Sequence, residues 1–238
     1  MKKYILAALI LVAIVAASGC IGQNIKGSGN VINQSQNVSG FNQVALDGVG
    51  TIIITQGNQE SLNIEAEDNI MPHIKTSVSN NKLSISYDNG VPVQTKPIIF
   101  HLTVKDLNTV DISGAGKIQS DNLKVNSLTI KTNGASEANL SNLNVDVLSI
   151  IISGAGRLFL SGTANTQNIN VSGAGDYNAN NLTSKTVTIT INGAGKGTIR
   201  VSDSLNAVVN GAGQISYIGS PQVTQQLSGA GSIKQIQG

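Results

Sequence analysis

Hydrophobic and polar residues alternate along most of the chain after its first 20 residues, with the two-residue period of strands that bury one face. In the segment 186–191, for example, Val187, Ile189 and Ile191 alternate with threonines. No stretch beyond Ala17 shows a sustained 3.6-residue spacing of apolar residues, so we expect essentially no helix. The pattern therefore predicts an all-β protein.

A tetrapeptide, Ser/Asn-Gly-Ala-Gly, interrupts the strands seven times and divides the C-terminal half into repeats of 18 to 20 residues. The copies begin at Ser113, Asn133, Ser153, Ser172, Asn192, Asn210 and Ser228, and the second copy ends in Ser136 instead of glycine. A near-constant period of this length indicates stacked coils, none of which can bury its hydrophobic face alone. We therefore predict a single-stranded parallel β-helix, or solenoid. We assume right-handed coils from the general preference of parallel crossovers.

Each tetrapeptide is interpreted as a sharp corner between two strands. Glycine allows a positive φ at such a bend. The first glycines of the seven corners are Gly114, Gly134, Gly154, Gly173, Gly193, Gly211 and Gly229. The alanine that follows is the same in all seven copies, and we expect that only a methyl group fits where the corners stack. A phosphate-binding glycine loop would need a following helix and a Lys-Ser/Thr pair, which the sequence does not provide.

A column of charged residues follows the corners. Lys117, Glu137, Arg157, Asp176 and Lys196 occupy the same position in successive coils. Coils in register would place opposite charges about 5 Å apart on one face. We predict a surface ion ladder, worth about 0.2–1 kcal/mol per exposed pair, whose main value is to specify register. A ligand-binding stripe is the alternative.

The N-terminal third is less regular than the repeats. Residues 44–54 are a degenerate strand–corner–strand unit with Gly-Val-Gly at the corner. Three alternating segments follow it, at Ser61–Ala66, Lys82–Tyr87 and Ile98–Val104. We expect these segments to form an antiparallel β addition that covers the edge of the first coil. At the other end, the glutamine-rich last coil is expected to be a polar cap.

The first 19 residues have the features of a lipoprotein signal peptide. Lys2 and Lys3 precede an uncharged apolar run, Tyr4–Ala17, which is short for a membrane-spanning helix. The run ends in Ala-Ser-Gly-Cys, which resembles a lipobox with Cys20 as the residue that receives the lipid. The alternative is an ordinary secretory signal followed by an unused thiol. We expect export and lipid anchoring at the outer side of the cytoplasmic membrane or in the cell envelope.

These observations divide the chain into four parts. They are a signal peptide (1–19), an anchor and lead-in segment (20–40), an N-terminal β region (41–104) and the solenoid repeats (105–238).

The composition limits the classes of function that the chain can have. Of 238 residues, 12% are charged and 3% aromatic, with one cysteine and two histidines, which excludes disulfide scaffolds and Cys/His zinc clusters. Loss of Lys2 and Lys3 with the signal peptide leaves 13 basic and 13 acidic residues, so a nucleic-acid partner is not expected. No cofactor or metal is expected either.

Several motifs, taken as a set, resemble the "head GIN domain" family. They are Gly-Ser-Gly-Asn-Val at 27–31, Val-Ser-Gly-Phe at 38–41, Leu-Asp-Gly-Val-Gly at 46–50 and the Ser-Gly-Ala-Gly repeats. The resemblance covers about residues 27–235 and implies a β-helix-like fold, export, frequent lipid anchoring and the label of an auto-transporter adhesin. The chain departs from the family at Asn133–Ser136, and at Gln34–Gln36, where an arginine is common in relatives.

We expect a non-catalytic surface module that binds envelope polysaccharide or protein. A structural envelope protein that self-associates end to end is the first alternative. A polysaccharide-degrading β-helix enzyme is the second, but it would need clustered aspartates for calcium and an Arg or Lys base. The acidic residues occur singly in the ladder, and the arginines are limited to Arg157 and Arg200. His73 and His101 have no recognisable Cys, Ser or Asp partner and are expected to be structural.

Overall fold

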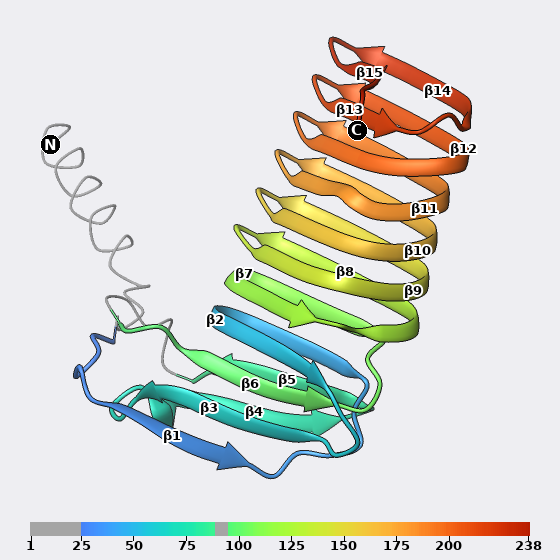
Figure 1. Ribbon diagram of the computed structural model, residues 1–238. Helices are drawn as coiled ribbons and strands as arrows, with labels where there is room; N and C mark the ends of the chain where they lie inside the picture. The colour runs from blue at the N-terminus through green and yellow to red at the C-terminus, as the bar shows by residue number, and fades with distance from the viewer. Residues whose placement is uncertain (1–24, 89–94) are drawn as a thin grey trace, which may run out of the picture.

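The computed structural model describes residues 25–88 and 95–238, and nearly all of this chain is β-structure (Figure 1). The N-terminal strands are β1 (Val31–Gln36), β2 (Gln43–Gln56), β3 (Ser61–Glu67), β4 (Ile74–Ser79), β5 (Lys82–Tyr87) and β6 (Ile99–Val104). The strands that follow are β7 (Thr109–Asp121), β8 (Lys124–Gly134), β9 (Glu137–Gly154), β10 (Arg157–Gly173), β11 (Asp176–Gly193), β12 (Lys196–Gly211), β13 (Gln214–Ile218), β14 (Gln222–Gly229) and β15 (Ser232–Gln235). One 3-10 turn, η1 (Met71–His73), interrupts the strands of the described ranges. The all-β prediction is confirmed, while the predicted signal peptide and Cys20 lie outside the described residues.

The repeats wind into a parallel solenoid of about six turns (Figure 1). β7 pairs with β8 and β9, β8 pairs with β9, and β9, β10, β11 and β12 pair in succession, all in parallel. β13 and β14 lie on β12, and β15 lies on β13; β14 and β15 make the last coil. The corners fall in register from coil to coil, which confirms the predicted repeat. The handedness of the coils stays a prediction.

Each coil has two walls joined by its corner. We call the strand before the corner the first wall and the strand after it the second wall. In one coil, Ile150 and Ile152 of the first wall and Leu158 and Leu160 of the second wall are at most 4% exposed. Because one aliphatic layer from each wall fills the interior, the core needs few large rings.

Tyr177 is an exception to this aliphatic core. Its ring is fully buried, and the in-register residue of the next coil is Gly197. A Cβ at Gly197 would lie 2.5 Å from Cδ1 of Ile189, so the interior has no room for a second side chain there.

The N-terminal strands extend both walls of the first coil. β2 carries the degenerate corner, where Gly48, Val49 and Gly50 pair with the corner of β7. On its other edge β2 pairs in parallel with β5 along the first wall and with β6 along the second wall. Antiparallel pairing begins one strand further out, with β4 on β5, β3 on β6 and β1 on β3. The antiparallel N-terminal addition is therefore confirmed, although the strands that touch the first coil are parallel to it.

The last coil is open. All eight residues of β14 are exposed, and in the described chain β14 and β15 each pair with a strand on one side only. Val223 and Leu227 stand in register with Leu205 and Val209, which are fully buried one coil earlier. With no coil above them, Val223 and Leu227 are 38% and 51% exposed. The expectation of a polar cap is wrong at these inward-facing positions.

Candidate functional site

The corners form a continuous ridge along the solenoid. Their first glycines have φ between 109° and 123°, a conformation that disfavours any residue with a Cβ. A Cβ at Gly154 would lie 2.7 Å from the carbonyl oxygen of Gly134, and each of the other six corners has the equivalent clash. The same oxygen accepts a hydrogen bond from the N–H of Ala155 at 2.9 Å. Glycine is therefore required both by its φ and by the close approach of the coil before it.

The alanine of each corner is not the crowded residue. Ala115, Ala155 and Ala194, like the other corner alanines, are exposed. The crowded positions are the glycines on either side: a Cβ at Gly175 would lie 2.5 Å from Cγ2 of Ile152. The expectation that only a methyl group fits at the alanine is wrong, and the ridge instead carries a row of exposed methyl groups.

The charged column lies on the second wall. Lys117, Glu137, Arg157, Asp176 and Lys196 are neighbours in register from coil to coil. Lys117 Nζ and Glu137 Oε2 are 3.2 Å apart, and both side chains are about half exposed. The other three neighbouring pairs, all within the described residues, have no N–O approach within 4.0 Å. One such exposed contact contributes at most about 1 kcal/mol.

A shallow hollow lies beside this column, midway along the solenoid. It has a volume of about 310 Å³ and is lined by Asn139, Phe159, Leu160, Ser161, Asn178, Asn180 and Asn181. Phe159 is in register with Asn139 on one side and with Asn178 on the other. The ring of Phe159 is 40% exposed, whereas Phe41 and Phe100 are buried.

The amide side of the hollow is held by hydrogen bonds. The N–H of Asn180 donates to Oδ1 of Asn178 at 3.3 Å, and Nε of Arg200 donates to the carbonyl oxygen of Asn180 at 2.8 Å. None of the seven lining residues is charged. The hollow therefore offers one apolar ring and several amides, each of which can donate and accept hydrogen bonds. Alternation along the segment Arg157–Leu160 could have revealed Phe159, because position 159 has the parity of the outward residues.

The inner face of the same coils holds a buried hydrogen-bond chain. The hydroxyl of Tyr177 donates to Oε1 of Gln167 at 2.5 Å, and Nε2 of Gln167 donates to Oγ of Ser184 at 2.5 Å. All three residues are at most 2% exposed. Burial raises the pKa of Tyr177 well above its ordinary value, so the phenol stays protonated and acts as a hydrogen-bond donor in the core.

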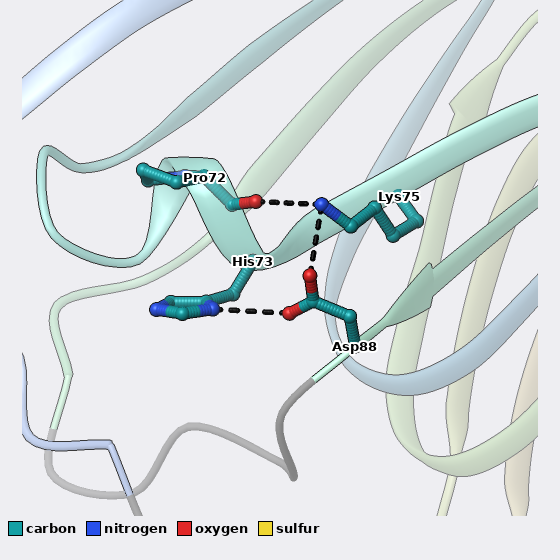
Figure 2. A network of polar contacts seen from close by, with 4 residues as sticks. All are labelled: Pro72, His73, Lys75 and Asp88. Atoms are coloured by element: carbon teal, nitrogen blue, oxygen red, sulfur yellow. Dashed lines mark hydrogen bonds and ion pairs between the residues drawn. The ribbon is translucent and has the colours of Figure 1, made fainter.

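His73, Lys75 and Asp88 form a polar cluster near the N-terminal end (Figure 2). Asp88 Oδ1 lies 3.0 Å from His73 Nδ1, and Asp88 Oδ2 lies 2.8 Å from Lys75 Nζ, which also donates to the carbonyl oxygen of Pro72 at 2.9 Å. The hydrogen bonds from Lys75 and then His73 hold the pKa of Asp88 below its usual value.

The expectation that His73 has no Asp partner is wrong, whereas His101 lies near a glutamate, a residue type that the expectation did not cover. Asp88 pairs with His73, and His101 Nε2 lies 3.6 Å from Glu65 Oε2 across the β3–β6 pair. We interpret the cluster as a structural tie between η1, β4 and the end of β5.

A further polar cluster, the lead-in clasp, joins residues 26–30 to Glu67, Asp68 and Asn69. Glu67 is 2% exposed, and its carboxylate accepts hydrogen bonds from the hydroxyl of Thr95, from the N–H of Gly29 at 2.6 Å and from the N–H of Lys96 at 3.0 Å. These bonds, with that of Thr95 the largest, lower the pKa of Glu67.

The rest of the clasp uses exposed side chains. Asp68 accepts from Ser28 Oγ at 2.5 Å and from Asn30 Nδ2 at 2.8 Å, and both bonds lower its pKa. Asn69 Nδ2 donates to the carbonyl oxygen of Lys26 at 2.8 Å. The clasp therefore fixes the first described residues at the antiparallel end of the molecule.

Within residues 25–88 and 95–238, no group of three His, Cys, Asp or Glu side chains is placed to hold a metal ion. In the same two ranges, no helix has the length and hydrophobicity of a membrane span.

The stacked corners, the two flat walls and the antiparallel end define the molecule as a parallel β-solenoid. The chain belongs to the family described as "Putative auto-transporter adhesin, head GIN domain", whose model matches residues 40–221. The family resemblance stated from sequence is therefore confirmed.

Solved structures share this fold. A "putative adhesin" from Bacteroides fragilis is 30% identical, with a TM-score of 0.84 over 90% of this chain and 100% of that chain. A "putative lipid binding protein" from Parabacteroides distasonis, 19% identical, has a TM-score of 0.74 over 90% of this chain and 100% of that chain. A "putative adhesin" from Parabacteroides merdae, 21% identical, has a TM-score of 0.66 over 90% of this chain and 99% of that chain. The last two show the fold alone. A search of the curated proteins finds no match to this chain.

Proposed function

We propose that the protein is an exported, lipid-anchored adhesin, a non-catalytic module that binds polysaccharide or protein of a cell envelope. The observation that carries this proposal is the surface of the solenoid, in which a flat wall presents in-register polar side chains around an open, uncharged hollow. Membership of an adhesin family and the 30% identical B. fragilis protein support it. The polar clusters near the N-terminal end act as ties between strands, which favours binding over catalysis.

The proposed lipid anchor at Cys20 defines which end of the molecule faces the membrane. The six residues from Cys20 to Lys26 span at most about 20 Å. The clasp holds Lys26 at the antiparallel end, and β14 lies at the opposite end (Figure 1). An anchored molecule would therefore hold its antiparallel end near the membrane and carry its walls and open coil outward.

Adhesion of cells that carry the full-length protein tests the proposal. Such cells should bind isolated envelopes more strongly than a deletion strain does. Cys20→Ser should release the protein into the medium and abolish cell adhesion, while the released protein still binds envelopes. Equal binding by the wild-type and deletion strains would refute adhesion, and retention of Cys20→Ser at the membrane would refute the anchor.

Self-association is a second candidate function, favoured by the open coil. β14 and β15 have free backbone edges, which are templates for pairing with another chain. Residues 214–238 contain a single charged side chain, Lys234, so two identical ends repel each other weakly. We propose a two-fold contact in which β14 of one molecule pairs with β14 of another and buries Val223 and Leu227. Two membranes facing each other could be joined by such a contact.

A further inference from the structure

We propose that the hollow around Phe159 is a binding subsite for one pyranose ring of a neutral glycan. The inference rests on the proposed adhesive function and assigns the place and the chemical class of ligand. The hollow is formed by three adjacent coils, through Asn139, Phe159 and Asn178 in register.

Phe159 is unusual for its position. The outward column that contains it is otherwise polar from β7 to β13, at Gln119, Asn139, Asn178, Thr198 and Ser216, while β2 adds the apolar Ile53 next to Gln119. The other described phenylalanines are buried, whereas Phe159 exposes its aromatic ring to water, where burial would have been more favourable. A flat aromatic ring can pack against the C–H face of a sugar, which is the apolar surface that a glycan offers.

The amides around the ring match the other surface of a sugar. Each sugar hydroxyl donates and accepts a hydrogen bond, and each asparagine side chain does the same through its NH₂ and carbonyl groups. Asn139 and Asn178 flank the ring at the spacing of paired strands, about 4.8 Å on either side. A sugar seated on Phe159 would therefore place its equatorial hydroxyls towards amides on two sides.

The charges near the hollow favour a neutral ligand. None of the lining residues is charged. Arg157, two residues before Phe159, stands in register between Glu137 and Asp176. Arg200 also lies at the hollow, where its Nε donates to the carbonyl oxygen of Asn180. An acidic sugar would therefore meet two carboxylates and two guanidinium groups, with no net charge to attract it.

The column continues beyond the hollow as Gln119 on one side and as Thr198 and Ser216 on the other. A polar side chain recurs once per coil, about every 4.8 Å, which is close to the length of a pyranose unit in an extended polysaccharide. A polymer lying along the solenoid axis could contact one polar side chain per sugar and stack one sugar on Phe159. The subsite should therefore accept an internal segment of a chain, with weak single sites multiplied by avidity.

Binding by variants of the full-length, lipidated protein in detergent tests the subsite. The probes are immobilised neutral glucans, mannans, galactans and N-acetylglucosamine polymers, with uronate polymers for comparison, and isolated envelopes before and after periodate oxidation of their sugars. We expect wild type to bind at least one neutral polymer and to bind envelopes in a periodate-sensitive way. Phe159→Ala should weaken both by about tenfold or more, Phe159→Tyr by less than about twofold, and Asn178→Ala by a few-fold.

Ile151→Ala is the matched control, because Ile151 is 41% exposed on the first wall of the same coil, does not line the hollow, and its truncation also removes exposed apolar area. It should leave binding unchanged, and all four variants should keep the wild-type unfolding temperature. If wild type binds envelopes but Phe159→Ala binds them equally, the adhesive function stands and the subsite is wrong. Periodate-resistant binding, binding to uronate polymers alone, or an equal loss in Ile151→Ala would also overturn the subsite. If wild type binds neither polymers nor envelopes, the proposed function itself fails.

Discussion

The two ends of the solenoid differ in how far the strand edge and the core residues of their terminal coil are covered. At the N-terminal end the edge of β2 is covered on both walls, by β5 and β6, and further strands pair outside them. At the C-terminal end the strands β14 and β15 offer a bare edge and two uncovered aliphatic side chains. A solenoid coil contacts only its neighbours, so covering one end does nothing for the other. The difference indicates that one end is built as a closed base and the other as a surface open to contact.

The stability lost through a substitution at a corner should depend on the position of that corner along the stack, and this is the largest effect we expect. In Gly173→Ala the new Cβ would lie 2.6 Å from the carbonyl oxygen of Gly154, at a φ of 109°, with coils packed on both sides. We expect the free energy of unfolding in denaturant to fall by more than about 3 kcal/mol.

Gly229→Ala is the matched variant at the open end. Its Cβ would lie 2.4 Å from the carbonyl oxygen of Gly211, but its coil has no neighbour above and can shift. We expect at most about half the loss seen for Gly173→Ala. Equal losses would show that the end coil is as constrained as the middle and would weaken the comparison.

Opening the clasp should make the N-terminal end resemble the C-terminal one. Glu67→Gln keeps the side-chain shape but removes the charge that accepts hydrogen bonds from Gly29, Lys96 and Thr95. We expect faster amide hydrogen exchange in residues 26–36 and little change in β9–β12. The conservative Glu65→Gln, also on β3, is the control, and an equal effect there would show that the clasp is not responsible.

The same carboxylate predicts a pH dependence. Because the folded-state pKa of Glu67 is lowered, its stabilising contribution is present above the ordinary carboxylate range and is lost as the pH falls through the lowered value. Asp68 acts with the same sign. The unfolding temperature of wild type should therefore drop in acid more than that of Glu67→Gln. Parallel pH curves for the two proteins would contradict this.

Charging the open end should affect association more than stability. In Leu227→Lys, a 51% exposed side chain is replaced by one that tolerates water, so the unfolding temperature should change little. If the ends pair, sedimentation of wild type should show a concentration-dependent dimer that Leu227→Lys lacks. Ile32→Lys on β1, 37% exposed at the covered end, is the control and should leave the dimer intact. A dimer lost in Ile32→Lys instead would place the contact at the base.

The smallest effect should come from the charged column. Lys117→Glu would set a carboxylate beside Glu137 in place of the 3.2 Å ion pair. Because both groups are about half exposed, we expect the free energy of unfolding to fall by at most about 1 kcal/mol, and we expect this loss to disappear at high salt. Lys185→Glu, an exposed lysine in β11, is the control for net charge. A salt-independent loss of several kcal/mol would mean that the column holds the coils together instead of refining their register.

Repetition explains how much the sequence could predict. The corners, the strands and their register were accessible because each residue type recurs at one position of every coil. The lead-in clasp was not accessible, because Glu67 meets Gly29 and Lys96 across irregular segments without a repeat. β1 was missed because most of its six residues are polar and do not alternate. The corner alanine was misjudged because recurrence shows that a position is constrained but not which neighbouring atom constrains it.

The stacked corners also have an evolutionary consequence. The five corners from Gly134 to Gly211 each dock on the one before through the same pair of contacts, an alanine N–H to a glycine carbonyl and a bare glycine Cα against that carbonyl. A whole coil could therefore be duplicated or deleted by recombination without changes to the antiparallel end or to the open last coil. Each such event would lengthen or shorten the rod by about 4.8 Å. In an anchored molecule, the reach above the lipid surface would thus become a trait that selection can tune in discrete steps.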